Sequence, residues 1–237
     1  MQYEIKGTPF PVIICHLEPN ETVCCQKGAM SWMSPNMQMS TNAGGGIGKM
    51  FSRAVSGESI FQNKYTAIGG NGEIAFASTV PGQVLPVEIS PARTIVASKS
   101  AYIASSPDVE MSLFFQKKFG VGLFGGEGFI MQKFTGNGIA FLEVDGSCVE
   151  YDLNAGESIL LDTGYLVAMD ATCSVDIESV KGVGNALFGG ESLFNTKVTG
   201  PGHIWIQTMP VYALANAVRP YIPTGNYFYI ITQSFHS

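Results

Sequence analysis

One sequence pattern occurs three times along the chain, and this repetition limits the possible folds more than any other feature. The segments Leu17–Val23, Ile89–Ile95 and Leu153–Ile159 each read aliphatic, any residue, Pro or Ala, any residue, charged, Thr or Ser, β-branched. A second block follows each of them, and Gly57–Thr66, Gly126–Thr135 and Gly190–Thr199 share Gly-Glu, an apolar pair, Lys and Thr. Two blocks that recur in the same order predict three tandem modules of roughly 65 to 70 residues.

Within each module the apolar residues follow the two-residue period of a β-strand. Val23 and Cys25 share one face of the first predicted strand, and Cys24 lies on the other. The same alternation occurs at residues 95–97 and 159–161, where the middle residue is Val96 or Leu160. Since both faces are apolar, we expect this strand to be covered on both sides. Helix is scarce, and the best candidate is the short segment 211–218 before Pro220.

These patterns predict an all-β fold, a compact β-prism or barrel-like array of three repeats with pseudo-threefold symmetry. The composition agrees, because 46% hydrophobic and 14% charged residues with 28 Gly and 12 Pro exclude disorder and a helical bundle. We expect one domain over residues 1–213, with repeats at about 17–85, 89–149 and 153–213. Residues 214–237 would hold the end of the short helix and an extension.

Charge and cysteine content restrict the function further. A formal net charge of −6 disfavours a large surface that neutralises nucleic-acid phosphates. Residues 1–6 lack the features of a signal or transit peptide, and no apolar run reaches the roughly 20 residues that span a bilayer. The five cysteines are odd in number and form no C-x-x-C pair, which fits a reducing compartment. We expect a soluble cytoplasmic protein.

Four motifs that suggest catalysis do not hold up. The loop 44–50 has the wrong glycine spacing for a phosphate-binding loop and no Ser or Thr after its lysine. A cupin-type metal site would need more ligands than His16, His203 and His236 offer. Cys24 and Cys25 correspond to aliphatic residues in the other repeats, so we interpret them as core residues. No G-x-S-x-G elbow supports a hydrolase. We therefore predict no catalytic residue, no metal site and no cofactor.

Three sets of residues recur at one repeat position each and are candidate contacts. Glu58, Glu127 and Glu191 either gather at the axis or accept backbone N–H bonds at their own turns. Lys64, Lys133 and Lys197 either form a ring that meets an anionic partner or protect strand edges from aggregation. Phe51, Phe124 and Phe188 lie in or beside three glycine-rich loops and either form an assembly or membrane-contact surface or tuck over the barrel mouth.

Several blocks resemble a known family. The segments 56–63, 69–74, 136–141 and 199–208 are similar to those of the family of the altered inheritance of mitochondria protein 24, over about residues 3–215. The resemblance implies modules like those of the tryptophan RNA-binding attenuator protein and a homotrimer in which nine modules close a ring. It implies no enzymatic activity, and the binding sites of the attenuator protein find no match here. The tail from Arg219 departs from the family pattern.

Four functional hypotheses follow. The first is a non-enzymatic, homo-oligomeric β-ring scaffold or binding protein. The second is a module that binds an anionic small molecule or single-stranded nucleic acid, although the net charge makes nucleic acid the less favoured ligand. The third is a metal-dependent cupin-type enzyme, and the fourth is a peripheral membrane protein that uses its Gly/Phe loops.

Overall fold

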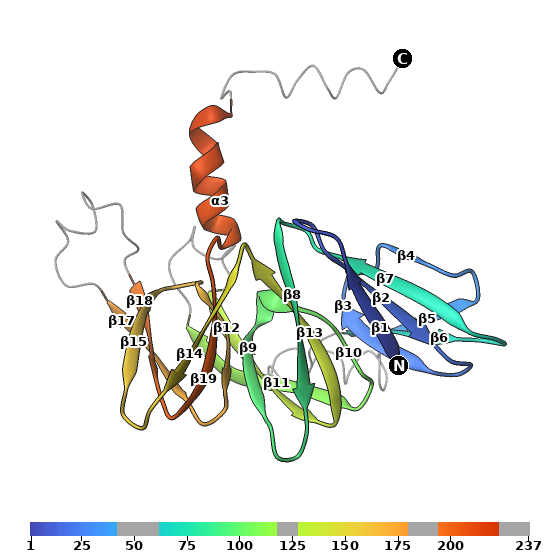
Figure 1. Cartoon of the computed structure of the whole chain (residues 1–237), viewed down its shortest axis with the longest axis horizontal. Coiled ribbons are helices and arrows are strands. Elements are labelled where there is room, and N and C mark those ends of the chain that lie inside the picture. Colours follow the sequence, from blue (N-terminus) through green and yellow to red (C-terminus); the bar gives the residue numbers. More distant parts are fainter. Residues whose placement is uncertain (42–61, 118–127, 180–193, 223–237) are drawn as a thin grey trace, which may run out of the picture.

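The computed structural model describes residues 1–41, 62–117, 128–179 and 194–222, and most of them lie in β-strands (Figure 1). Strand β1 (Gln2–Lys6) comes first. Module 1 (residues 12–77) holds β2 (Val12–Leu17), β3 (Thr22–Gln26), β4 (Trp32–Met33), β5 (Met37–Thr41), β6 (Gln62–Ala67) and β7 (Gly72–Ala77). Module 2 (residues 82–145) holds β8 (Gly82–Ile89), β9 (Ile95–Ser98), the 3-10 helix η1 (Lys99–Ala101), β10 (Tyr102–Ser105), β11 (Val109–Lys117), β12 (Phe129–Gly136) and β13 (Gly138–Asp145).

Module 3 (residues 148–207) holds β14 (Cys148–Leu153), β15 (Ser158–Asp162), β16 (Leu166–Asp170), β17 (Ser174–Ser179), β18 (Phe194–Thr199) and β19 (Gly202–Gln207). The helix α3 (Val211–Val218) and the 3-10 helix η3 (Arg219–Tyr221) follow. The predicted all-β class is confirmed, and the predicted short helix is present at residues 211–218.

The strands form four antiparallel sheets, which we number from the N-terminus. Sheet 1 has the order β1-β2-β7-β4, sheet 2 β5-β6-β3-β10-β13-β8, sheet 3 β11-β12-β9-β16-β19-β14, and sheet 4 β15-β18-β17. Figure 1 shows the sheets following one another from the N-terminal module to the C-terminal one. The described strands do not close into a barrel. A threefold axis that relates the modules stays a prediction.

Strand pairing recurs at corresponding places in the three modules. Leu17, Ile89 and Leu153, which begin the first sequence block, lie opposite Gly72, Gly138 and Gly202 in three antiparallel pairs. At Gly202 a side chain is excluded by a positive φ of +148° and by the neighbouring Cys173 and Asp170. The first residue of the first block is therefore the last residue of a strand (β2, β8 or β14). The glycine after the second block is the first residue of the strand that pairs with it (β7, β13 or β19).

The charged residue inside the first block stabilises a tight turn. Glu21 Oε2 accepts a hydrogen bond from the backbone N–H of Glu18 at 3.0 Å, and Glu157 Oε2 accepts one from Asn154 at 2.9 Å. Such side-chain acceptors satisfy backbone donors that the turn leaves unpaired. In module 2 this position holds Arg93, which cannot accept a hydrogen bond.

Three apolar layers separate the four sheets. Layer 1 lies between sheets 1 and 2 and includes Ile13, Ile74 and Phe141. Layer 2 lies between sheets 2 and 3 and includes Leu142 and Trp205, and layer 3 lies between sheets 3 and 4. Sheets 2 and 3 are therefore covered on both faces, whereas sheets 1 and 4 each have one outer face.

This layering explains the strand that was predicted to be covered on both sides. Cys24 in sheet 2 and Val96 in sheet 3 are 1% and 0% exposed, as expected. Leu160 occupies the same position in sheet 4, and it is 56% exposed. The prediction was therefore wrong for Leu160, because no further sheet covers it among the described residues.

Helix α3 projects from one end of the sheets (Figure 1). None of its residues is buried. Tyr212 fixes its first turn, since the hydroxyl donates to Asp162 Oδ2 at 3.0 Å and the ring meets Tyr165 edge-on. Among the described residues, no helix is long and apolar enough to cross a membrane.

Candidate assembly interface

Neighbouring modules are joined by strand pairing. Strand β3 of module 1 pairs with β10 of module 2, with Ser105 opposite Cys24. Strand β9 of module 2 pairs with β16 of module 3, with Met169 opposite Val96. At each junction, the strand that carries the end of the first sequence block (β3 or β9) therefore pairs with a short strand of the next module (β10 or β16).

Strand β15 carries the end of the first sequence block in module 3, as β3 and β9 do in modules 1 and 2. Strand β3 pairs with β6 and β10, and β9 pairs with β12 and β16, so both have a neighbour on each side. Within the described part of the chain, β15 pairs only with β18. Counting the described residues alone, its other edge has no neighbour, and the side chain of Leu160 on the outer face of this strand is exposed.

Strand β4 is the corresponding open strand at the other end of the molecule. It occupies the place of β10 and β16, each of which has two neighbours. Counting only residues that the structure describes, β4 pairs with β7 alone, and both of its residues, Trp32 and Met33, are exposed. An apolar strand with a free edge is a template for pairing with another chain.

The two end sheets are complementary halves of one sheet. Sheet 4, β15-β18-β17, has the strand order of the half β3-β6-β5 of sheet 2. Sheet 1 without β1, β2-β7-β4, has the order of the other half, β8-β13-β10. Joining β15 to β4 of a second copy would therefore complete a six-stranded sheet of the kind seen twice inside the chain.

Apolar side chains at one end of layer 3 also lack the cover that their counterparts have in layer 1. Val149 and Tyr151 on β14 are exposed. Their counterparts on β2, Ile13 and Cys15, are fully buried in layer 1, where the half-sheet β10-β13-β8 covers them. Within the ranges that the structure describes, sheet 4 has no such half, and the end of layer 3 is exposed there.

The three repeat lysines lie on the central strand of each three-stranded half. Lys64, Lys133 and Lys197 stand opposite Cys24, Val96 and Leu160. They belong to sheets 2, 3 and 4, so each comes from a different sheet. Lys197 also forms an ion pair with Glu178, with Nζ 3.4 Å from Oε1.

The other candidate sets fall outside the described residues. Glu58, Glu127 and Glu191 lie there, as do Phe51, Phe124 and Phe188. The proposed glutamate cluster and the loop surface therefore stay predictions.

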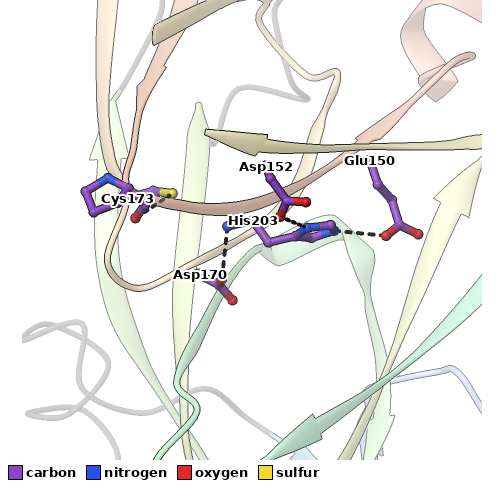
Figure 2. A network of polar contacts seen from close by, with 6 residues as sticks. Glu150, Asp152, Asp170, Cys173 and His203 are labelled. Atoms are coloured by element: carbon purple, nitrogen blue, oxygen red, sulfur yellow. Dashed lines mark hydrogen bonds and ion pairs between the residues drawn. The ribbon is translucent and has the colours of Figure 1, made fainter. Parts of the chain in front are cut away.

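A histidine network links strand β19 to the edge strand β14 (Figure 2). His203 Nδ1 lies 2.7 Å from Asp152 Oδ1, and Nε2 lies 2.9 Å from Glu150 Oε2. Its backbone N–H donates to Asp170 Oδ2 at 2.9 Å, and its ring packs edge-on against Trp205. Partial burial lowers the pKa of His203, but the hydrogen bonds with Asp152 and Glu150 outweigh it and raise the pKa overall. Cross-strand pairing produces this network, and the sequence alone does not reveal it.

A cavity of about 640 Å³ lies at the junction of modules 2 and 3 beside α3. Lys99, Glu143 and Asp145 line it, so its charges are of both signs. Asp145 Oδ2 accepts a hydrogen bond from the backbone N–H of Val211 at 2.9 Å, and burial raises the pKa of its carboxyl group. The cavity wall therefore holds the start of the helix.

The cysteines and histidines give no reactive cluster. All five cysteines are free thiols, and burial raises the pKa of Cys15 and of Cys25 to about 12. Over the described ranges, no group of three or more His, Cys, Asp or Glu is placed to hold a metal ion. This bears on His16 and His203, whereas His236 lies outside those ranges.

Comparisons with known proteins agree with the architecture. The family model described as "Mitochondrial biogenesis AIM24" matches residues 3–209. An uncharacterized protein of Streptococcus pyogenes serotype M6 is 28% identical over 229 residues, which are 93% of this chain and 90% of that protein. A crystal structure of a Streptococcus pyogenes protein superposes with a TM-score of 0.76 at 24% identity, and the match covers 93% of this chain and 99% of the other. This likeness shows the fold.

Proposed function

This chain belongs to the family described as mitochondrial biogenesis AIM24, and from that premise and its two open strand edges we propose a non-enzymatic, homo-oligomeric β-scaffold. In this proposal β15 of one copy pairs with β4 of the next, head to tail. The observation that carries it is that both strands lack a neighbour, among the described residues, where their counterparts inside the chain have one.

A head-to-tail contact uses two different surfaces, so repeated copies form a ring when the rotation closes and a filament when it does not. The resemblance recognised in the sequence favours closure with three chains and nine modules. Closure would leave no open edge of this type, which is how β proteins avoid uncontrolled pairing.

Burial of apolar side chains would contribute to the association free energy. Fully burying one large apolar side chain stabilises by about 1.5–3 kcal/mol. Leu160, Trp32, Val149 and Tyr151 are all exposed in the single chain and lie beside the open edges. Because each of them is already about half buried, their further burial and the new backbone hydrogen bonds would offset part of an association cost of roughly 4–15 kcal/mol.

Light scattering after size-exclusion chromatography tests the proposal. We expect the wild-type protein to elute as a trimer of the 25.3 kDa chain. The Leu160→Glu variant should elute as a monomer, because the charge would be buried at the new sheet. Leu113→Glu is the matched control, since Leu113 is also exposed but lies on β11, away from both edges. A monomeric wild-type protein would overturn the proposal.

A further inference from the structure

One aromatic and one alanine face each other across the paired strands of every module, but their places are exchanged in module 1. Ala104 on β10 pairs with Phe141 on β13, and Ala168 on β16 pairs with Trp205 on β19. In module 1 the large residue is on the short strand instead, where Trp32 on β4 pairs with Ala75 on β7. The pair keeps one large and one small side chain in all three modules.

The aromatic side chains of modules 2 and 3 share one role. Phe141 is packed in layer 1, which is the core of module 1, and Trp205 is packed in layer 2, which is the core of module 2. Each aromatic thus fills the core of the preceding module. Ala104 and Ala168 lie beside them in the same layers and are fully buried. Among the described residues no such layer covers Trp32, and it is 47% exposed.

We infer that Trp32 is the anchor of this contact and inserts into layer 3 of the neighbouring copy. The inference rests on the head-to-tail assembly proposed above. In layer 3 Trp32 would cover Val149 and Tyr151, whose exposure marks the open end of that layer. Tryptophan is among the residues that dominate binding energy at interfaces when they become buried in an apolar site.

The internal junctions also set the register of the contact. Met33 corresponds to Ser105 and Met169, because each directly follows the tryptophan or alanine of its own short strand. Their cross-strand partners are equivalent as well, namely Ile74, Ala140 and Ile204. Ser105 lies opposite Cys24, and Met169 lies opposite Val96. Since Leu160 is the counterpart of Cys24 and Val96, Met33 of one copy lies opposite Leu160 of the next. Trp32 then lies opposite Leu161, which belongs to layer 3.

Tryptophan fluorescence tests the anchor. The chain has two tryptophans, so in Trp205→Phe, excited at a wavelength that tyrosine does not absorb, the emission comes from Trp32. We expect emission of a buried indole, protected from iodide quenching, when this variant is assembled. Adding Leu160→Glu should shift the emission to that of an exposed indole. An assembled variant whose Trp32 stays exposed would overturn the inference and leave the assembly proposal standing.

Cysteine cross-linking tests the register. Under mild oxidation, Met33→Cys combined with Leu160→Cys should give covalent oligomers on a denaturing gel. Met33→Cys combined with Ser158→Cys, two residues away on the same face, is the out-of-register control and should give at least tenfold less product. Preferential cross-linking of the control pair in a protein that assembles would contradict the register alone. A protein that is monomeric by light scattering would instead contradict the assembly itself.

Discussion

The imidazole Nδ1 of His203 lies 2.7 Å from Oδ1 of Asp152, directly across the pair of strands β14 and β19. Glu150 holds the other ring nitrogen from the same strand. Strand β14 is an edge strand of sheet 3, so this contact helps to hold an edge whose outer side has no neighbour among the described residues. Asp170 and Arg93 are the other charged groups nearby, since Asp170 accepts the backbone N–H of His203 and Arg93 lies over Trp205.

The raised pKa of His203 predicts a pH-dependent stability. Its contribution is fully present below the unfolded-state pKa of about 6.5 and is lost as the pH rises through the higher folded-state pKa. His203→Gln should therefore destabilise the protein by about 0.5–1 kcal/mol at pH 6 and by less at pH 9. Urea unfolding at the two pH values measures this. Asp152→Asn should show the same trend, and an equal loss at both pH values would contradict the assignment.

Equivalent methionines should differ in their effect on folding. Met169 is fully buried in layer 3, whereas Met33 is exposed on β4. In a Leu160→Glu background, which keeps the chain monomeric, Met169→Ala should cost about 2–5 kcal/mol of unfolding free energy. Met33→Ala should cost less than about 0.5 kcal/mol. Chemical denaturation followed by circular dichroism makes the comparison, and similar losses for both variants would show that the two strands are not in different environments.

The turn glutamate of module 3 should contribute a modest stabilisation. Glu157 Oε2 accepts hydrogen bonds from the backbone N–H and from Nδ2 of Asn154, at 2.9 and 3.0 Å. Glu157→Ala removes both and should lower the free energy of unfolding by about 0.5–1.5 kcal/mol. Glu178→Ala is a suitable control, because its ion pair with Lys197 is largely exposed. A smaller loss for Glu157→Ala than for the control would be inconsistent with a capping role.

The thiols should be unreactive in the native protein. Cys15, Cys24, Cys25 and Cys173 are buried, and burial raises the pKa of each thiol. Only Cys148 is partly exposed. Ellman's reagent should therefore titrate at most one thiol per chain quickly at pH 8, and all five after denaturation. Fast reaction of two or more native thiols would show that module 1 or module 3 is more open than its buried thiols imply.

The repeated blocks predicted the strands well, because their signal is local. Leu153 and Gly202 mark the end and the start of paired strands, and the turn between Asn154 and Glu157 is encoded within four residues. The exposure of Leu160 could not be read in the same way. Its sequence context matches that of Val96, and the two differ in that, among the described residues, no further sheet covers the outer face of sheet 4.

The histidine network was not predicted from the sequence, although the strand register leads to it. Once Leu153 is placed opposite Gly202, antiparallel register puts Asp152 opposite His203. Comparison of equivalent repeat positions does not indicate the contact between His203 and Asp152. The positions equivalent to His203 hold Glu73 and Ile139, which share no particular chemistry with it. Cross-strand neighbours, not repeat equivalents, give this residue its partners.

Mixing two one-sided variants tests head-to-tail assembly most directly. Leu160→Glu blocks β15 and leaves β4 intact, whereas Trp32→Glu blocks β4 and leaves β15 intact. Light scattering should give each variant alone the mass of one 25.3 kDa chain, and an equimolar mixture the mass of two chains and no more. If the mixture stays monomeric while the wild-type protein is oligomeric, β4 and β15 do not pair with each other, and the account is wrong.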